Sequence, residues 1–529
     1  MKKTIILLSC LGLGALSAAA QNLNPQVQVT NDYETRMSEV RKNDLTMAVP
    51  DSVTQFRTEV DYTVFDTPYR GAYDFTPYSV RVLPKLRSFD ARKLYVRAGA
   101  GYPLHPELQA VWSPVTKGLM RMSVYQDLQG YLGRYKSVDG TRFDGHDLDE
   151  NFGVEGRWNK ERFDMSWQAD YRGLFTRDDL ADGKFHDVNL SARLVSNEPD
   201  STLFYYSFAV GLGYAYEDLP GAAFIREPMY SIDATLGPVI DFRYKLLIDF
   251  HLQQSSYAEN VFDEVSLTYV RPRVEMEFGP AHVSGGVFMA LGDHLFLRPD
   301  VRANVNLFGE RLGVYAAVTG EERIRDYSSY KCSDHWFSPA YTNSLNRSFD
   351  EIKALLGVRG SLWNKFQYDL NGGWGNLSSM SVYALAASAA DPARYVYQLR
   401  FSDYRHTWVE LLGSWESDRL AVDGRFCWNK TDMDAAYLDL PAVCTNLRAV
   451  YNWNRRIFAG ATVDAESLRY SAFRTLDGFI NLSLDASYRF NRRTEAWARI
   501  GNLFGAEITR SPLHMEMGPS FTLGVAFSL

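Results

Sequence analysis

Cysteine is scarce in this sequence: Cys10, Cys332, Cys427 and Cys444 are the whole set among 529 residues. Small secreted folds without a large core depend on a dense framework of disulfides, and this count excludes that class. One pair could still form after export. The sequence has no C-x-x-C spacing, so it lacks the usual thiol motif for a metal or for redox chemistry.

Long apolar runs are also missing. The first 20 residues are typical of a secretory signal, with two lysines, a short apolar core from Ile5 to Leu16, and small residues that allow cleavage before Gln21. An alternative in which Cys10 accepts a lipid needs a longer apolar run before it. Beyond residue 20 nothing approaches the roughly 20 apolar residues of a spanning helix. The exported chain is therefore either soluble or held in a membrane as a barrel.

Basic residues are fewer than acidic ones. The formal net charge is −8, and it becomes −10 without residues 1–20, which contain two lysines and no acid. Nucleic acid is therefore not an expected partner, because phosphate binding requires a basic surface. Aromatic residues make up 14% of the chain and include 32 tyrosines. Tyrosine and tryptophan gather at membrane interfaces, so this content favours a membrane protein.

An alternation of period two dominates the rest of the chain. From Phe163 to Arg172, apolar residues take every second position, and Asp164, Ser166, Gln168 and Asp170 stand between them. The same pattern covers residues 206–214, 270–278, 480–489 and 521–529. Successive side chains of a strand point to opposite faces, so each segment has one apolar and one polar face.

These segments predict an all-β fold, a single transmembrane antiparallel β-barrel. At roughly 10 to 14 residues they exceed the common soluble strand of about 5 to 6 and match the 9 to 11 or more of tilted membrane strands. A secreted β-sandwich or propeller also alternates, but the four ionisable positions from 271 to 277 speak against it. We expect about 20–22 strands over residues 91–529, after a signal peptide (1–20) and a periplasmic or lumenal segment (21–90).

Breaks in the alternation indicate the connections. Residues 159–161 and 491–493 read as short periplasmic turns, whereas 137–150, 323–349 and 378–394 read as long extracellular loops. The stretch 323–349 lacks alternation and is expected to hold helical turns.

The closing hairpins resemble those of TonB-dependent receptors. The likeness rests on Leu476–Ser483, on Ala486–Asn491, on the turn Ala498–Gly505 with its Asn-Leu-Phe, and on the last strand. The chain as a whole looks like plug-less, TonB-dependent-receptor-like proteins of Bacteroidota, a softer likeness that rests on Val82–Lys85, Leu94–Tyr102 and Ala436–Pro441. It implies an outer-membrane location, outer-membrane lipid and the barrel-assembly machinery as partners, and another outer-membrane protein as a further partner.

The chain departs from that family in two places. About 70 residues lie between the signal and the first good strand, fewer than a plug domain needs, although Gln26–Thr30 is similar to the short energy-coupling box of such receptors. The assembly signal of barrels ends in an aromatic residue, whereas this chain ends in leucine. The predicted assembly strand keeps its outward row, which consists of Phe521, Leu523, Val525, Phe527 and Leu529.

Chemical motifs are sparse, and we predict no catalytic residue, metal site or cofactor. Asp144–Glu150 holds four carboxylates and reads as a solvated external loop, since it lacks the order of a calcium loop. Cys332, Asp334 and His335 lie close in sequence, but neither a nucleophile site nor a metal site can be assigned from adjacency. No H-E-x-x-H, P-loop or G-x-S-x-G motif is present.

Charges on the inward face are the most informative polar set. They comprise Lys245, Asp249, Arg271, Arg273, Glu275, Glu277, Asp485 and Arg489. Such residues either set the selectivity of a pore or form networks that brace the barrel and close its lumen, and we favour bracing. The sequence predicts a non-enzymatic outer-membrane barrel in transport or in a larger complex. A TonB-dependent ligand-uptake receptor and a surface hydrolase are the alternatives.

Overall fold

The computed structural model describes residues 93–529, apart from 116–118, 139, 178–181, 198–203, 219–223, 241–242, 259–260, 293–294, 309–310, 343, 364, 388–394, 434–436, 438–439, 471–474 and 510–513. The predicted signal peptide, the segment 21–90 and the similarity at Gln26–Thr30 therefore lie outside the described residues. The barrel begins at Leu94, close to the predicted boundary.

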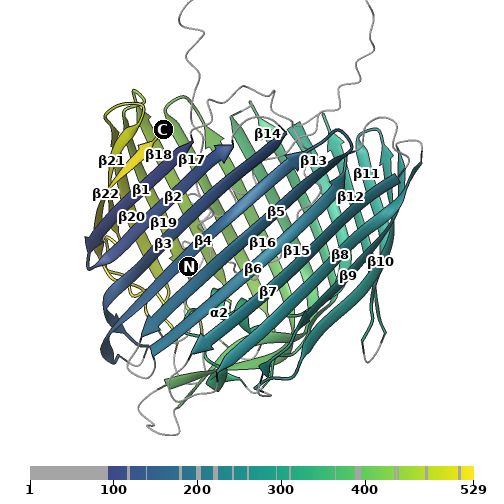
Figure 1. Ribbon diagram of the computed structural model, residues 1–529, viewed down its shortest axis with the longest axis horizontal. Coiled ribbons are helices and arrows are strands. Elements are labelled where there is room, and N and C mark those ends of the chain that lie inside the picture. Colours follow the sequence, from purple (N-terminus) through teal and green to yellow (C-terminus); the bar gives the residue numbers. More distant parts are fainter. Residues whose placement is uncertain are drawn as a thin grey trace, which may run out of the picture.

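The described residues form one closed antiparallel barrel of 22 strands (Figure 1). The first half consists of β1 Leu94–Tyr102, β2 His105–Val115, β3 Met120–Lys136, β4 Arg142–Asn159, β5 Phe163–Arg177, β6 Asp182–Ser196, β7 Phe204–Asp218, β8 Ile225–Ile240, β9 Tyr244–Ser255, β10 Val265–Phe278 and β11 Ala281–Ala290. The second half consists of β12 Phe296–Leu307, β13 Leu312–Arg323, β14 Ser348–Leu362, β15 Phe366–Ala387, β16 Tyr395–Glu416, β17 Leu420–Thr431, β18 Val443–Trp453, β19 Ile457–Glu466, β20 Phe479–Arg489, β21 Thr494–Gly501 and β22 Ser520–Ser528. Two short helical elements, α2 Tyr327–Ser333 and η4 Pro339–Tyr341, interrupt this pattern between β13 and β14.

The alternation places an apolar band on the outside of the barrel. In β7, Phe208, Val210 and Leu212 are each more than 40% exposed, and the residues between them face the lumen. Such an exposed apolar surface is stable when it contacts lipid, as the outer face of a transmembrane barrel does. The predicted fold class is thus confirmed, and the strand number lies at the upper end of the expected range. Among the described residues, no helix is long and apolar enough to cross a membrane.

Pairing of β22 with β1 closes the barrel. Phe527 lies opposite Val96 and Leu523 opposite Ala100 in an antiparallel register. The five members of the row 521–529 are between 37% and 55% exposed and therefore face outward, while their role in assembly stays a prediction. The inward side of this seam is fastened by the His105 imidazole, whose Nε2 lies 2.6 Å from Thr522 Oγ1. The terminal leucine takes part in closure, because its backbone N–H donates to Leu94 O at 2.8 Å.

Connections at the two ends differ as expected, but two loop predictions are wrong. The turns after β4 and β20 are short, and both lie at the end where the chain leaves the barrel. The acidic stretch 144–150, however, belongs to β4 rather than to a loop, and residues 378–387 continue β15. The outer ends of these strands extend past the lipid band into water, where neither face has to be apolar, so the alternation disappears although the strand continues.

Candidate functional site

The predicted lumen charges of β9 and β10 lie in one ion-paired network with β12. The Asp249 carboxylate accepts from Arg271 Nε at 2.9 Å and from Arg273 Nε at 2.8 Å, and Arg271 Nη1 also reaches Asp300 Oδ2 at 3.0 Å. Arg273 in addition pairs with Glu275. Pairing across neighbouring strands fits the bracing interpretation, and a role in selectivity stays a prediction.

The other predicted charges lie apart from this network or at its edge. Lys245 stands 5.8 Å from the centre of the Tyr205 ring, and Glu277 lies 3.8 Å from His282 Nδ1. On the far side of the seam, Arg489 Nε is 3.3 Å from Glu495 Oε2, and Asp485 lies four residues earlier in the same strand, opposite Arg499. The eight residues therefore do not form one ring.

The connection between β13 and β14 forms a separate site at the outer mouth. These residues, 324–347, are named here the cap segment; they contain α2, which Figure 1 shows inside the end of the barrel opposite the C-terminus. Asp326 begins the helix, and its carboxylate accepts the backbone N–H of Ser329 at 3.0 Å, as an N-cap does. The expected helical turns in 323–349 are confirmed.

A buried ion pair anchors the cap segment to β7. Lys331 Nζ lies 2.6 Å from Glu217 Oε1, with side-chain exposures of 3% and 0%. The same ammonium donates to Phe337 O at 2.8 Å, and the Tyr327 hydroxyl donates to Glu217. Glu227 of β8 accepts the backbone N–H of Ser328 at 2.9 Å. Burial of two opposite charges is tolerable only when both find such partners.

A second contact fixes the cap segment to β4. His335 Nδ1 lies 2.9 Å from Asp147 Oδ1, and its Nε2 is 3.8 Å from Asp149, which also holds Arg172 at 2.8 Å. Burial alone lowers the pKa of His335, but the two carboxylates outweigh it, so the pKa is raised above its usual value. The sequence predicts a solvated loop at Asp147 and Asp149. In the structure, these two carboxylates instead hold the cap segment.

Cys332 points into the same interface and is the free cysteine of the described residues. Burial raises the pKa of its thiol to about 12, and the nearby Arg172 offsets only part of this effect. A thiol is nucleophilic as the thiolate, so this environment opposes a catalytic role. Among the described residues no group of three or more His, Cys, Asp or Glu side chains is arranged to hold a metal ion.

Aromatic side chains of the cap segment pack against strands around the outer mouth. Tyr327, Tyr330 and Phe337 are fully buried in a cluster with side chains of β5–β8 and of β15 and β16. The Tyr397 hydroxyl of β16 donates to Asp334 at 2.9 Å. The Trp336 ring stacks on the imidazole of His514 in the β21–β22 connection, with the ring centroids 4.2 Å apart. Because its contacts reach strands from several parts of the circumference, the cap segment spans the outer mouth.

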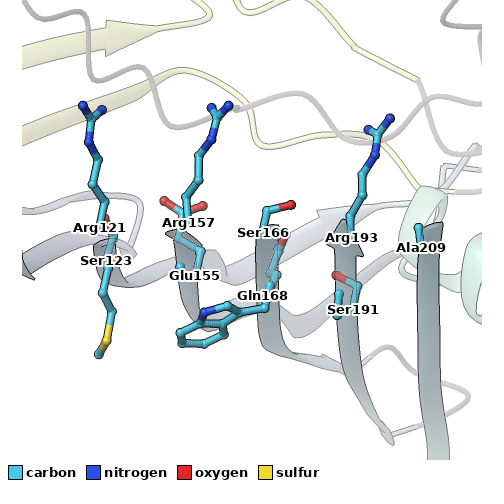
Figure 2. Close-up of a pocket in the computed structure, with 13 residues that line it drawn as sticks. Arg121, Ser123, Glu155, Arg157, Ser166, Gln168, Ser191, Arg193 and Ala209 are labelled. Atoms are coloured by element: carbon cyan, nitrogen blue, oxygen red, sulfur yellow. The ribbon is translucent and has the colours of Figure 1, made fainter. Parts of the chain in front are cut away.

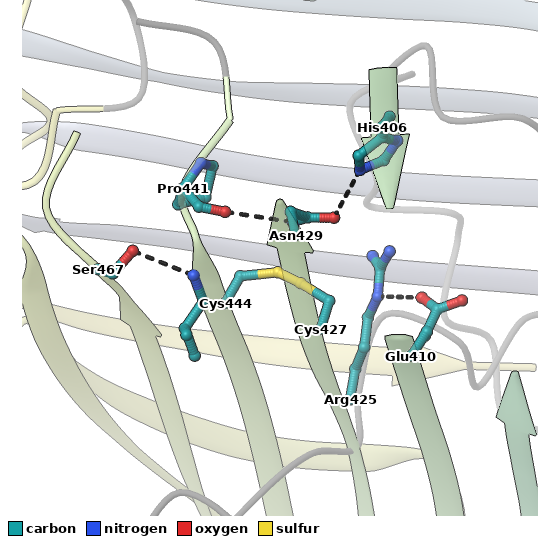
Figure 3. Close-up of a disulfide and its surroundings, with 9 residues drawn as sticks. His406, Glu410, Arg425, Cys427, Asn429, Pro441, Cys444 and Ser467 are labelled. Carbon is teal, nitrogen blue, oxygen red and sulfur yellow. Dashed lines mark hydrogen bonds and ion pairs between the residues drawn. A yellow bond between two sulfur atoms is a disulfide. The ribbon is translucent and has the colours of Figure 1, made fainter. Parts of the chain in front are cut away.

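A disulfide ties β17 to β18 near the same end. Cys427 and Cys444 are directly opposite in the register, with their Cα atoms 5.1 Å apart, so the open question of a pair is answered (Figure 3). Beside it, Asn429 donates to Pro441 O at 3.2 Å and lies 3.1 Å from His406 Nε2. The bond fastens the strand ends that carry the 432–442 connection.

Sequence reasoning missed Glu217, Glu227 and Lys331. Glutamates near the outer ends of alternating strands look like ordinary lumen residues, and Lys331 stands in a polar stretch. The one available signal was the absence of alternation in a stretch rich in tyrosine, where Tyr327 and Tyr330 lie three residues apart. This spacing is that of a helix face.

Together, these features define the class of the protein: a wide outer-membrane β-barrel with its outer mouth spanned by its own chain. No protein-family model matches the sequence, and no curated protein matches it. Solved structures match the fold. The siderophore receptor PirA from Acinetobacter baumannii aligns with a TM-score of 0.62 at 7% identity, over 82% of this chain and 80% of that chain.

Two further structures give the same result. The copper transporter OprC aligns with a TM-score of 0.60 at 15% identity, and a mutant of the ferric enterobactin receptor PfeA from Pseudomonas aeruginosa with 0.58 at 9%; each match covers 82% of this chain and 80% of that chain. At these identities the likeness establishes the fold, a 22-stranded antiparallel barrel, and nothing beyond it.

Proposed function

We propose that this chain is an outer-membrane uptake barrel that admits a ligand when the cap segment is displaced from its mouth. The cap segment is the observation that supports it: a barrel of 22 strands is wide enough to leak, and barrels of this size are transporters with a filled lumen. The fold likeness to a copper transporter and to siderophore receptors, with the TonB-dependent-receptor resemblance at the closing hairpins, favours ligand uptake over a purely structural role in a complex.

Replacing residues 327–341 by a glycine-serine linker of equal length tests this proposal. We expect the variant to assemble in the outer membrane and to make cells sensitive to vancomycin, which an intact outer membrane excludes. In planar bilayers the purified variant should give large, stable conductance steps, whereas the complete chain should remain mostly closed. The cause is loss of the buried contacts of Tyr327, Tyr330 and Lys331.

The matched control replaces residues 388–394, which follow β15 and precede β16 in the sequence, by the same kind of linker. Its producers should remain resistant to vancomycin. If the cap replacement assembles normally and leaves both resistance and conductance unchanged, the cap segment does not close the path and the uptake proposal is wrong.

A further inference from the structure

Three arginines form one row across the inner wall, at the end of the barrel away from the cap segment. Arg121 of β3 is directly opposite Arg157 of β4, Arg157 is opposite Ser166 of β5, and Ser166 is opposite Arg193 of β6. We call Arg121, Arg157 and Arg193 the arginine row. Figure 2 shows the three side chains extended in the same direction from neighbouring strands.

The row lines a pocket of about 520 Å³. The neighbouring inward positions carry hydrogen-bonding side chains, namely Ser123, Ser166, Gln168 and Ser191, and a single acid, Glu155. Adjacent strands lie about 4.8 Å apart, so the row extends over roughly 14 Å of wall. The pocket thus combines three guanidinium groups with neutral donors on one concave surface.

Charge is not balanced within the row. Arg157 Nη2 has an acidic partner, Asp164 Oδ2, at 3.0 Å. In the part of the chain that the structure describes, neither Arg121 nor Arg193 forms a salt bridge. Like charges directly opposite each other on neighbouring strands destabilise a sheet. The arginines of β10, in contrast, are neutralised by Asp249 on the next strand and by Asp300 two strands away, so bracing does not account for the arginine row.

We propose that the arginine row is a binding subsite for a small solute that carries two or more oxyanion groups, phosphates or carboxylates. Guanidinium groups bind such oxygens through paired, charge-assisted hydrogen bonds. Arg121 and Arg157 are close enough to hold one group, and Arg193, two strands further, holds the second, with Ser166 between them. This inference rests on the proposed uptake function. In that function, a ligand that has passed the cap segment reaches the arginine row on its way through the barrel.

Isothermal titration of the full-length protein in detergent with sodium tripolyphosphate tests the subsite directly. We expect saturable binding at low salt, and weaker binding of orthophosphate, because one phosphate occupies only part of the row. Arg121→Gln with Arg193→Gln should weaken tripolyphosphate binding by at least about tenfold, since two charge-assisted contacts are lost.

The control removes the same charge at the same end of the barrel. Arg455→Gln with Arg492→Gln lies in the turns after β18 and β20, outside the pocket, and should leave the affinity within about twofold. Arg121→Lys with Arg193→Lys keeps the charge without the planar fork and should fall between wild type and the glutamine variant. Heat-shifted mobility on gels establishes that each variant is folded.

Absence of tripolyphosphate binding to the folded wild type overturns the subsite, and so does equal weakening by the control pair. The measurement needs neither cap opening nor transport. Normal binding together with a failed cap-replacement experiment would overturn the uptake proposal alone, so the two results are distinguishable.

Discussion

Lys331 and Glu217 are oppositely charged side chains buried at a point where the chain could have used apolar ones. Their attraction is offset by the loss of hydration of both groups, so such a pair contributes little compared with an apolar substitute. Removal of one partner, in contrast, leaves an uncompensated buried charge, which commonly costs about 3–5 kcal/mol. The pair therefore makes the position of α2 conditional on both residues.

This asymmetry predicts the behaviour of Lys331→Met. The variant should release α2 from β7 and expose Cys332 further; its alkylation by a maleimide is slow in the wild type because the residue is half-buried and the pKa of its thiol is raised to about 12. We expect at least a tenfold faster modification, measured by mass spectrometry of the Cys332 peptide.

A second substitution provides the control. Adding Glu217→Gln to Lys331→Met removes the uncompensated charge and keeps an acceptor for the Tyr327 hydroxyl, so much of the protection should return. Equal modification rates in the wild type and the single variant would show that the pair does not hold the cap segment.

At the scale of the element, the strands owe their form to two different surroundings. Within the lipid band, an outward residue must be apolar, as the exposed row of β22 shows. Beyond it, β4 continues with polar residues on both faces, and β15 continues with residues such as Val382 and Leu385, which are buried rather than exposed to lipid; backbone pairing with their neighbours holds both strands. Along part of a strand, contact with lipid thus requires outward residues to be apolar. Along the rest, only the backbone pairing with neighbouring strands is required.

Leu523→Arg tests the outward row of β22. A charge on the lipid face costs about 2–4 kcal/mol near the middle of the bilayer, and β22 pairs with β1 to close the barrel. We expect a large loss of heat-modifiable protein in the outer membrane. Ser231→Arg, on the lumen side of β8 and opposite the uncharged Gly211 and Gln253, should assemble at nearly wild-type levels; equal assembly of both variants would contradict the outward assignment.

At the scale of the molecule, the barrel is asymmetric along its axis. The cap segment spans the outer mouth through buried contacts, and the arginine row lies on the wall at the other end, beside the short turns. Between them, the ion pairs of β9, β10 and β12 stiffen one side of the wall. In the proposed uptake function, a path through the barrel therefore depends on movement of the cap segment rather than of the wall.

Closure of the mouth should depend on pH through His335. Its folded-state pKa is raised above the usual 6.5 by Asp147 and Asp149, against the effects of burial and of Arg172. The protonated form is favoured in the closed state, so this contribution is complete below about pH 6.5 and is lost as pH rises through the raised pKa. In planar bilayers, openings of the complete chain should become more frequent from pH 6 to pH 9.

His335→Gln cannot change charge, so its openings should vary less over the same range. An unchanged pH response in this variant would assign the effect to other groups.

The sequence alone determined the fold, because lipid imposes a period of two on every strand that crosses it and the row 521–529 carries that period to the chain end. It also located the non-strand stretch 323–349 and the charges of β9 and β10. Only the tertiary structure decided that this stretch folds inward, that Asp147 and Asp149 hold His335, and that Arg121, Arg157 and Arg193 share a row. These contacts depend on strand register and on side chains 36 to 188 residues apart, which local periodicity does not specify.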